Sequence, residues 1–198
     1  ARTVRVEPGS RNRARVTVLG RAPGEDAKER IVERVRHVLR LDEVWMLVSP
    51  GNPLKEGSDM AAYEARLASA RHQARCSLIK VSDIERELAT VYTVDTVGAL
   101  VRRFPRHRFI WLMGEDNLAQ FHHWRHWRRI AQTVPIAVVS RPGYDGAAHA
   151  ARAMGWLRRF VQPADQARHW TEWRPPALVI LRQPLDSTSA TGIHAAEP

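Results

Sequence analysis

The stretch GEDNLAQFHHWRHWRRIAQ, residues 114–132, carries a dense set of side chains that could do chemistry. Its histidines could bind a metal, because His122 and His126 are four positions apart and would share one face of a helix. Its mixture of arginine and tryptophan could bind nucleic acid, or one tryptophan could form the floor of a small-molecule pocket. We predict no metal site here, since no third ligand follows at a recognisable spacing and no H-E-x-x-H glutamate is present.

Composition narrows the class of protein. A chain of 198 residues, of which 44% are hydrophobic, is long enough for one substantial domain with its own core. Its apolar runs are far shorter than a membrane span, and residues 1–18 lack the apolar region of a secretory signal. The one cysteine, Cys76, is expected to be a buried, inert thiol and fits a reducing cytoplasm.

The net charge of +10 favours anionic ligands but does not by itself indicate a nucleic-acid partner. Arginine is spread along the whole chain, and the first fifteen residues form the arginine-rich block that stands out. We interpret residues 1–14 as a basic, solvated extension. The remaining chain, residues 15–198, is then the folded domain.

Short apolar runs alternate with amphipathic stretches along this domain. A helical pattern is clear at residues 26–40, 59–74 and 93–104, and Pro105 follows the last of them. The apolar runs suit strands that are covered on both faces of a sheet, and they lie at residues 15–20, 43–50, 76–83, 108–114, 136–143 and 177–183. This alternation predicts a single α/β domain with a doubly wound, mainly parallel sheet flanked by helices.

Ligands of such sheets bind at the carboxyl ends of the strands, near the point where the strand order reverses. Turn-forming residues with charged or hydroxyl neighbours follow four of the predicted strands, in SPGNPLK, GEDN, SRPGY and PLDSTSATGIH. Turn chemistry alone accounts for any one of these segments. Four of them at one edge of the sheet indicate a pocket.

In this order, the motifs resemble those of bacterial nicotinate-nucleotide adenylyltransferases, members of the Rossmann-like nucleotidyltransferase superfamily. The resemblance runs from about residue 41 to residue 194 and rests on LDEVWMLVSPGNPLK, EARLASAR, YTVDT, FIWLMGEDNLAQFHHWRHW, VPIAVVSRPGY and STSATGIH. It implies transfer of the adenylyl group of ATP to nicotinate mononucleotide, giving deamido-NAD and pyrophosphate, with Mg²⁺ accompanying ATP. It also implies a cytoplasmic monomer or homodimer with small-molecule substrates.

The same resemblance implies roles for individual residues. Trp124 would stack on the pyridine ring, whereas Trp127 is expected mainly to pack. The residues implied for nicotinate mononucleotide are Asn52, Lys55, Thr93, Asp95, Trp124 and Arg141, with Thr96 shaping the same loop as Asp95. Those implied for ATP are Gly20, Gly114, Asp116, Ser189, Thr191 and His194, the serine and threonine lying where a helix start would cradle phosphates. Asp95 and Asp116 could equally be loop or N-cap residues.

One family motif is missing. Members carry G-x-F-x-P-x-H-x-G-H after the first strand, whereas here RAPGEDAKERIVERVRH follows RVTVLG. The helical pattern survives, so a first strand–helix unit is still expected, but His37 lies too far along it to replace a signature histidine. His194 also stands where the closing S-S/T-T-x-I-R motif has arginine, and its charge at pH 7 is conditional. Since one preorganised charge-stabilising group supplies about 100- to 1000-fold in rate, little adenylyl transfer is expected.

The sequence leaves three explanations of this gap open. In the first, a reading-frame error has replaced the natural residues before Leu41. In the second, the chain is a diverged relative that binds nicotinate nucleotides but catalyses poorly. In the third, another cation serves the phosphates, such as Lys28, Arg30 or Arg34. An alternative of a different class is a non-catalytic α/β protein that binds nucleotide or RNA. Its affinity for single strands would fall steeply with salt.

Overall fold

The computed structural model describes residues 15–19, 25–48, 60–74, 79–140 and 150–182. Its centre is a seven-stranded sheet in the order β3-β2-β1-β4-β5-β7-β6, in which every neighbouring pair is parallel. The strands are β1 (Arg15–Leu19), β2 (Glu43–Leu47), β3 (Ile79–Ser82), β4 (Arg108–Gly114), β5 (Ile136–Ser140), β6 (Val161–Gln162) and β7 (Leu178–Arg182). The strand order reverses between β1 and β4, so the predicted doubly wound parallel sheet is confirmed. The sequence did not predict β6, whose two residues are too few for a periodic pattern.

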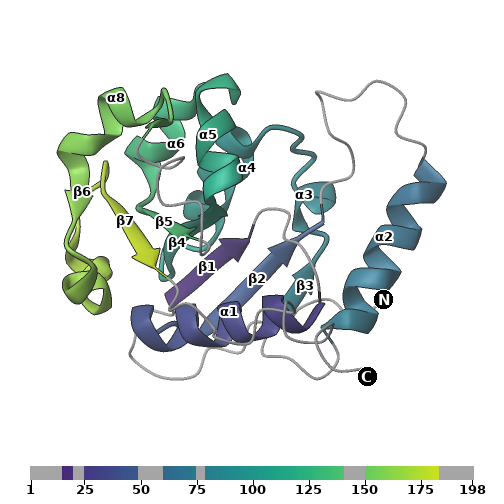
Figure 1. Ribbon diagram of the computed structural model, residues 1–198. Coiled ribbons are helices and arrows are strands. Elements are labelled where there is room, and N and C mark those ends of the chain that lie inside the picture. Colours follow the sequence, from purple (N-terminus) through teal and green to yellow (C-terminus); the bar gives the residue numbers. More distant parts are fainter. Residues whose placement is uncertain (1–14, 20–24, 49–59, 75–78, 141–149, 183–198) are drawn as a thin grey trace, which may run out of the picture.

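Helices cover both faces of this sheet (Figure 1). The α-helices are α1 (Glu25–Leu39), α2 (Met60–Gln73), α3 (Ile84–Glu87), α4 (Thr93–Arg103), α5 (Glu115–Gln120), α6 (Trp127–Thr133) and α8 (Met154–Leu157). The described residues also form 3₁₀ segments, namely η1 (Phe121–His123), η2 (Arg158–Phe160) and η3 (Ala164–Glu172). The helices predicted at residues 26–40, 59–74 and 93–104 are α1, α2 and α4, each within one residue at its described ends. The shorter helices carry too few turns for a clear period.

The strand β4 divides the core into two halves. Its side chains alternate between the faces of the sheet, so that Trp111 and Met113 join a buried cluster with α4, α5, α6 and α8. Ile110 and Leu112 join the cluster on the opposite face, with α1 and η3. On that second face the Nε1–H of Trp170 donates a buried hydrogen bond of 2.8 Å to the carbonyl of Leu39, which fixes η3 on the end of α1.

The first strand–helix unit belongs to this fold although its family motif is missing. β1 pairs in parallel with both β2 and β4, and α1 buries Val32, Val35 and Leu39 against the sheet. The sequence expectation of a first strand–helix unit is therefore confirmed. His37 is exposed in the last turn of α1, roughly 18 Å along the axis from its first residue at 1.5 Å per residue.

Two titratable groups lie at the amino end of the sheet. The Glu43 carboxylate accepts hydrogen bonds from Lys80 Nζ, at 2.5 Å, and from Trp45 Nε1, at 2.7 Å. Burial alone would raise the pKa of Glu43, but these two hydrogen bonds and the charge of Lys80 outweigh it and hold the pKa below its usual value. The His107 ring packs among Trp45, Phe104 and Phe109, and this burial lowers the pKa of His107, opposed by the charge of Glu43.

We expect Glu43→Gln to lower the free energy of unfolding at pH 7 by about 1–2 kcal/mol, because it removes an ion pair and weakens a hydrogen bond to the indole. A carboxyl whose pKa is lower in the folded chain stabilises above its unfolded pKa, near 4.5, and loses this effect as pH falls. The difference between the two proteins should therefore shrink below about pH 4.5 in urea titrations. The exposed Glu87→Gln is the control, and an equal loss in that variant would contradict the assignment.

The lowered pKa of His107 acts in the same direction, since the folded chain disfavours the protonated ring. Its contribution is complete above the unfolded pKa, near 6.5, and declines as pH falls. In a His107→Phe variant, urea titrations should show a shallower loss of stability between about pH 7 and pH 5 than in the parent chain. An unchanged slope would show that the titration of His107 is not coupled to folding.

Candidate nucleotide site at the carboxyl edge of the sheet

The described candidate residues come from two places near the carboxyl edge of the sheet. Gly114 and Asp116 lie at the end of β4 and the start of α5, while Trp124 lies between η1 and α6. Thr93 and Asp95 lie in the first turn of α4. The other candidates lie outside the described residues: Gly20, Asn52, Lys55, Arg141, Ser189, Thr191 and His194.

Gly114 and Asp116 form a close pair. Gly114 has extended backbone angles, φ −80° and ψ 168°, and is the N-cap of α5. The exposed carboxylate of Asp116 folds back so closely that a Cβ on Gly114 would collide with its Oδ1. Neither Asp116 nor Asp95 is an N-cap. Both lie in the first turn of their helices, where the helix dipole favours a negative charge.

Trp124 interrupts the helix that the sequence suggested. The chain leaves η1 after His123, Trp124 is extended with φ −70° and ψ 138°, and His126 is left-handed with φ 47°. Two tight turns replace a continuous helix, because the amide of Trp124 donates to Phe121 and the amide of Trp127 donates to Trp124. The expectation that His122 and His126 share a helical face is therefore wrong.

The spacing of the aromatic residues explains these turns. Phe121, Trp124 and Trp127 recur every three positions, which matches turns closed by i to i+3 hydrogen bonds better than it matches an α-helix. Phe121 is fully buried, and its ring centroid lies 5.4 Å from that of Trp124 and 5.6 Å from that of Trp127. Trp127 also meets the ring of Trp156 edge to face at 5.5 Å, so its expected packing role is confirmed.

The Trp124 ring suits a flat ligand. It is half-buried, and it meets Trp111 at 87° and Phe121 at 72° between ring planes. In the part of the chain that the structure describes, no aromatic ring stacks parallel on Trp124. A planar heterocycle can therefore stack there without displacing a described ring.

The start of α4 is joined to the Trp124 loop. The guanidinium carbon of Arg125 lies 4.5 Å from the ring centroid of Tyr92, which is the N-cap of α4, and α4 packs against α6. Sequence reasoning missed both residues, although each adjoins a candidate in the chain, Tyr92 beside Thr93 and Arg125 beside Trp124. This contact brings the YTVDT motif and the tryptophan into one neighbourhood.

The first turn of α4 offers free backbone donors. Tyr92 makes no side-chain cap, and its carbonyl accepts the amides of Asp95, at 2.9 Å, and Thr96, at 3.1 Å. The amides of Thr93 and Val94 donate to no acceptor in the described ranges. Helix starts of this kind bind anions through such amides and the helix dipole.

A cavity of about 520 Å³ lies elsewhere, between α1, η3 and the ends of β5 and β7. It is on the face of the sheet opposite α4 and α6, and none of the described residues implied for nicotinate mononucleotide or ATP lines it. Its polar side chains are Arg34, Asp165 and Arg182. Arg34, considered above as a substitute cation for phosphates, thus faces a different space from Trp124 and Thr93.

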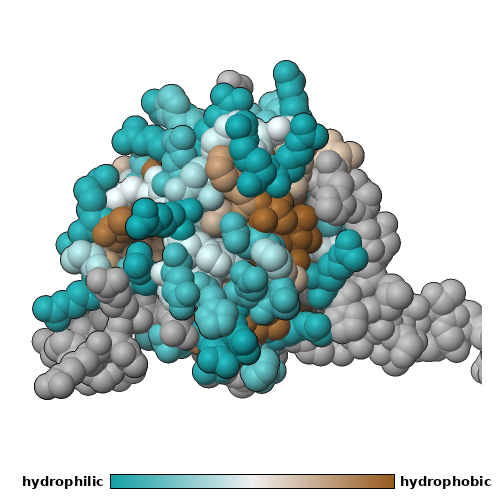
Figure 2. All heavy atoms as spheres, turned by 90° about the vertical axis from the view of Figure 1, so that its left-hand side faces the viewer, coloured by the Kyte–Doolittle hydropathy of each residue, from teal (hydrophilic) through white to brown (hydrophobic). Residues whose placement is uncertain are grey.

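The outer face near α8 and β6 is largely hydrophilic, with smaller hydrophobic areas between (Figure 2). Arg128 lies over the rings of Trp127 and Trp156, and Arg159 lies over Trp156 and Phe160.

Within the described ranges, no group of three histidine, cysteine or acidic residues is placed to hold a metal ion. Across those same residues, helices long and apolar enough to cross a membrane are not found.

Comparison with known proteins identifies the family of this chain. The cytidylyltransferase-like family profile matches residues 29–195. A probable nicotinate-nucleotide adenylyltransferase from Erythrobacter litoralis is 53% identical over 176 residues, which are 89% of this chain and 80% of the relative. The chain belongs to this family. Another member, from Parvibaculum lavamentivorans, is 48% identical over 172 residues, 87% of this chain and 86% of the relative.

Solved structures support the fold. A nicotinic acid mononucleotide adenylyltransferase from Plasmodium falciparum, complexed with NaAD, superposes with a TM-score of 0.57 at 11% identity, covering 86% of this chain and 76% of that one. The same enzyme complexed with APC gives a TM-score of 0.52 at 13% identity, over 86% and 75%. The Rossmann-like nucleotidyltransferase fold expected from the motifs is confirmed. The family match begins at residue 29, beyond the segment where the histidine signature was expected.

The contact between Arg125 and Tyr92 can be tested by a double-mutant cycle of Arg125→Gln and Tyr92→Leu. A cation over an aromatic face contributes about 0.5–1 kcal/mol at an exposed site, so the coupling energy from urea unfolding should fall in that range. Arg129→Gln, at an exposed arginine of α6, serves as the matched control with Tyr92→Leu. Coupling as large for Arg129 as for Arg125 would contradict a specific contact.

Proposed function

We propose that the chain transfers the adenylyl group of ATP to nicotinate mononucleotide, forming deamido-NAD and releasing pyrophosphate. The observation that carries this proposal is the neighbourhood of Trp124 and the start of α4, at the carboxyl edge of the sheet of a nicotinate-nucleotide adenylyltransferase family member. We infer a cytoplasmic enzyme whose substrates are both small molecules.

The nicotinate end of the pocket combines two kinds of contact. The pyridine ring would stack on the half-buried ring of Trp124, which contributes about 1–3 kcal/mol by analogy with bases on aromatic side chains. The carboxylate would meet the free amides at the start of α4, next to Thr93, where a negative charge is favoured. These contacts fall short of the roughly 8 kcal/mol needed for micromolar binding, so Asn52, Lys55 and Arg141 are assigned to the rest of the nucleotide.

At the ATP end, Gly114 allows the Asp116 carboxylate to fold against the end of β4, and we assign this pair to the ribose or adenine. Gly20, Ser189, Thr191 and His194 keep the roles that the family resemblance implies. Mg²⁺ bound to ATP neutralises phosphate charge. The ion would be held mainly by substrate phosphates and water rather than by the protein.

The protein contributes to the reaction by aligning the two substrates. A phosphate oxygen of nicotinate mononucleotide attacks the α-phosphorus of ATP, the bond from that phosphorus to the bridging oxygen breaks, and pyrophosphate leaves. Reactions of this class depend on positioning and charge stabilisation rather than on a covalent enzyme group. With two signature histidines missing, each worth about 100- to 1000-fold, we expect turnover roughly 10⁴-fold or more below that of a member that has them.

Trp124→Ala tests the nicotinate end of the pocket. We expect nicotinate mononucleotide to quench tryptophan fluorescence of the parent chain saturably, and its affinity to fall about 5- to 150-fold in the variant, the equivalent of one lost stack. Trp127→Phe is the matched control, since Trp127 packs against Phe121 and Trp156, and it should bind the nucleotide as the parent chain does.

A coupled assay tests the reaction itself: pyrophosphate should form slowly, and only when ATP and nicotinate mononucleotide are both present. Saturable quenching without turnover would indicate a relative that binds but does not catalyse. No quenching together with salt-sensitive binding of single-stranded RNA would overturn the proposal in favour of an RNA-binding protein.

A further inference from the structure

A buried polar network lies beneath the start of α4. Its members are Glu85 on α3, Thr90 in the connecting turn and Thr96 on α4. Thr96 is completely buried and Glu85 is only 5% exposed. No sequence motif pointed to Glu85 or Thr90, and the family resemblance implied only that Thr96 shapes the loop.

Three oxygen atoms lie within hydrogen-bond distance of the Thr96 hydroxyl. Thr96 Oγ1 lies 3.0 Å from Glu85 Oε1, 2.9 Å from Thr90 Oγ1 and 3.3 Å from the carbonyl oxygen of Tyr92. A hydroxyl has one hydrogen to donate, and a carboxylate is the strongest acceptor of the three. Thr96 therefore donates to Glu85, and the Thr90 hydroxyl lies within hydrogen-bond distance of both Thr96 Oγ1 and, at 3.5 Å, the carbonyl oxygen of Glu85.

Glu85 also holds the turn through its backbone. Its carbonyl accepts the amide of Thr90 at 2.9 Å, so Thr90 is tied to Glu85 by its main chain and, through Thr96, by its side chain. The turn between them contains Ala89 with φ 50°, a left-handed conformation that is uncommon for alanine and needs support from its surroundings. The path of this turn sets where Tyr92 and the free amides of α4 lie.

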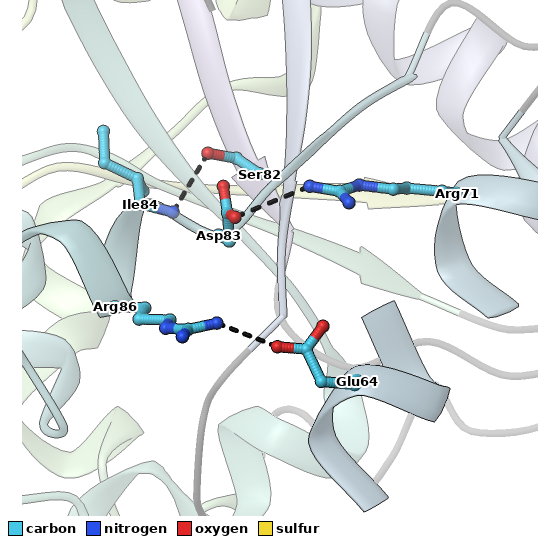
Figure 3. Close-up of polar contacts among 6 residues, drawn as sticks. All are labelled: Glu64, Arg71, Ser82, Asp83, Ile84 and Arg86. Atoms are coloured by element: carbon cyan, nitrogen blue, oxygen red, sulfur yellow. Dashed lines mark hydrogen bonds and ion pairs between the residues drawn. The ribbon is translucent and has the colours of Figure 1, made fainter. Parts of the chain in front are cut away.

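The helix that carries Glu85 is itself anchored on its other side (Figure 3). The Ser82 hydroxyl at the end of β3 accepts the amide of Ile84 at 3.2 Å. Two ion pairs join the segment to α2, Arg71 with Asp83 at 3.5 Å and Arg86 with Glu64 at 2.8 Å. These ion pairs are largely exposed, so each contributes little to stability. Together with the buried hydrogen bond, they hold in place the segment that carries Glu85.

We propose that Glu85 and Thr96 are positioning residues for the nicotinate end of the pocket. They do not touch the substrate; they hold the turn so that the amides of Thr93 and Val94 face the same space as Trp124. A buried carboxylate is a costly way to fasten a turn, because it needs its hydrogen bonds to offset the loss of water. Its strength as an acceptor gives the hydroxyl of Thr96 one fixed direction. The inference rests on the proposed function.

The test compares nicotinate mononucleotide and ATP binding in the full chain, by fluorescence quenching and by calorimetry respectively. Glu85→Gln and Thr96→Val should weaken binding of nicotinate mononucleotide about five- to tenfold, the equivalent of one buried hydrogen bond, and leave ATP affinity within about twofold. Thr96→Ser keeps the hydroxyl and should restore parental affinity. Glu87→Gln, two residues along α3 and exposed, should change neither affinity.

The outcomes separate this inference from the proposed function. Absence of quenching in the parent chain would overturn both. Quenching in the parent chain with unchanged affinity in Glu85→Gln and Thr96→Val would overturn the positioning role alone, and so would equal loss of affinity for both ligands. If Glu85→Gln fails to fold, Thr90→Val removes the hydroxyl that completes the network while leaving the carboxylate, and it should weaken nicotinate mononucleotide binding selectively.

Discussion

The alternation of side chains along β4 is the constraint on which the rest of the structure depends. Trp111 and Met113 face one half of the core, and Ile110 and Leu112 face the other. A shift of one residue would exchange the two sets and place Trp111 and Met113 where Ile110 and Leu112 now pack, so neither half would be filled correctly. Because β4 lies where the strand order reverses, its register also fixes the height at which Gly114 ends the strand. The start of α5 and the Asp116 carboxylate follow from that height.

The half of the core that contains Trp111 and Met113 also positions Trp124. Its ring can lie at the edge of the sheet only because Phe121 is buried behind it and Trp111 meets it from β4. The three-residue spacing of the aromatic side chains forces the chain out of a helix at this point, which leaves the tryptophan half-buried instead of turning it fully inward. Arg125 then bridges to Tyr92, so the core, the loop and α4 form one continuous support around Trp124.

The sequence predicted the strands well because apolar runs covered on both faces need no partner to be recognised. It predicted α1, α2 and α4 because each has enough turns to show a period. The break at Trp124 was missed because His122 and His126 suit a helix when considered alone, and only the packing of the neighbouring rings opposes it. The network of Glu85, Thr90 and Thr96 could not be predicted, because the burial of a carboxylate depends on tertiary neighbours that the sequence does not show. The motifs pointed to Thr93 and Trp124 as candidates, and their neighbourhood became visible only through the tertiary contact of α4 with α6.

The two ends of the pocket rest on different parts of the fold, and this bears on the missing histidine signature. The proposed nicotinate end is supported by α3, α4 and α6, whose buried residues belong to one half of the core, whereas α1 packs in the other half. Changes in the segment between β1 and α1 therefore leave the described support of Trp124 and α4 in place. Groups that act on the transferring phosphate lower the energy of the transition state more than that of the bound substrate, so their loss reduces kcat more than it weakens binding. Under the proposed function, such a chain retains its nicotinate site while losing most of its rate, because the proposed stacking site does not depend on the segment that lacks the histidine signature.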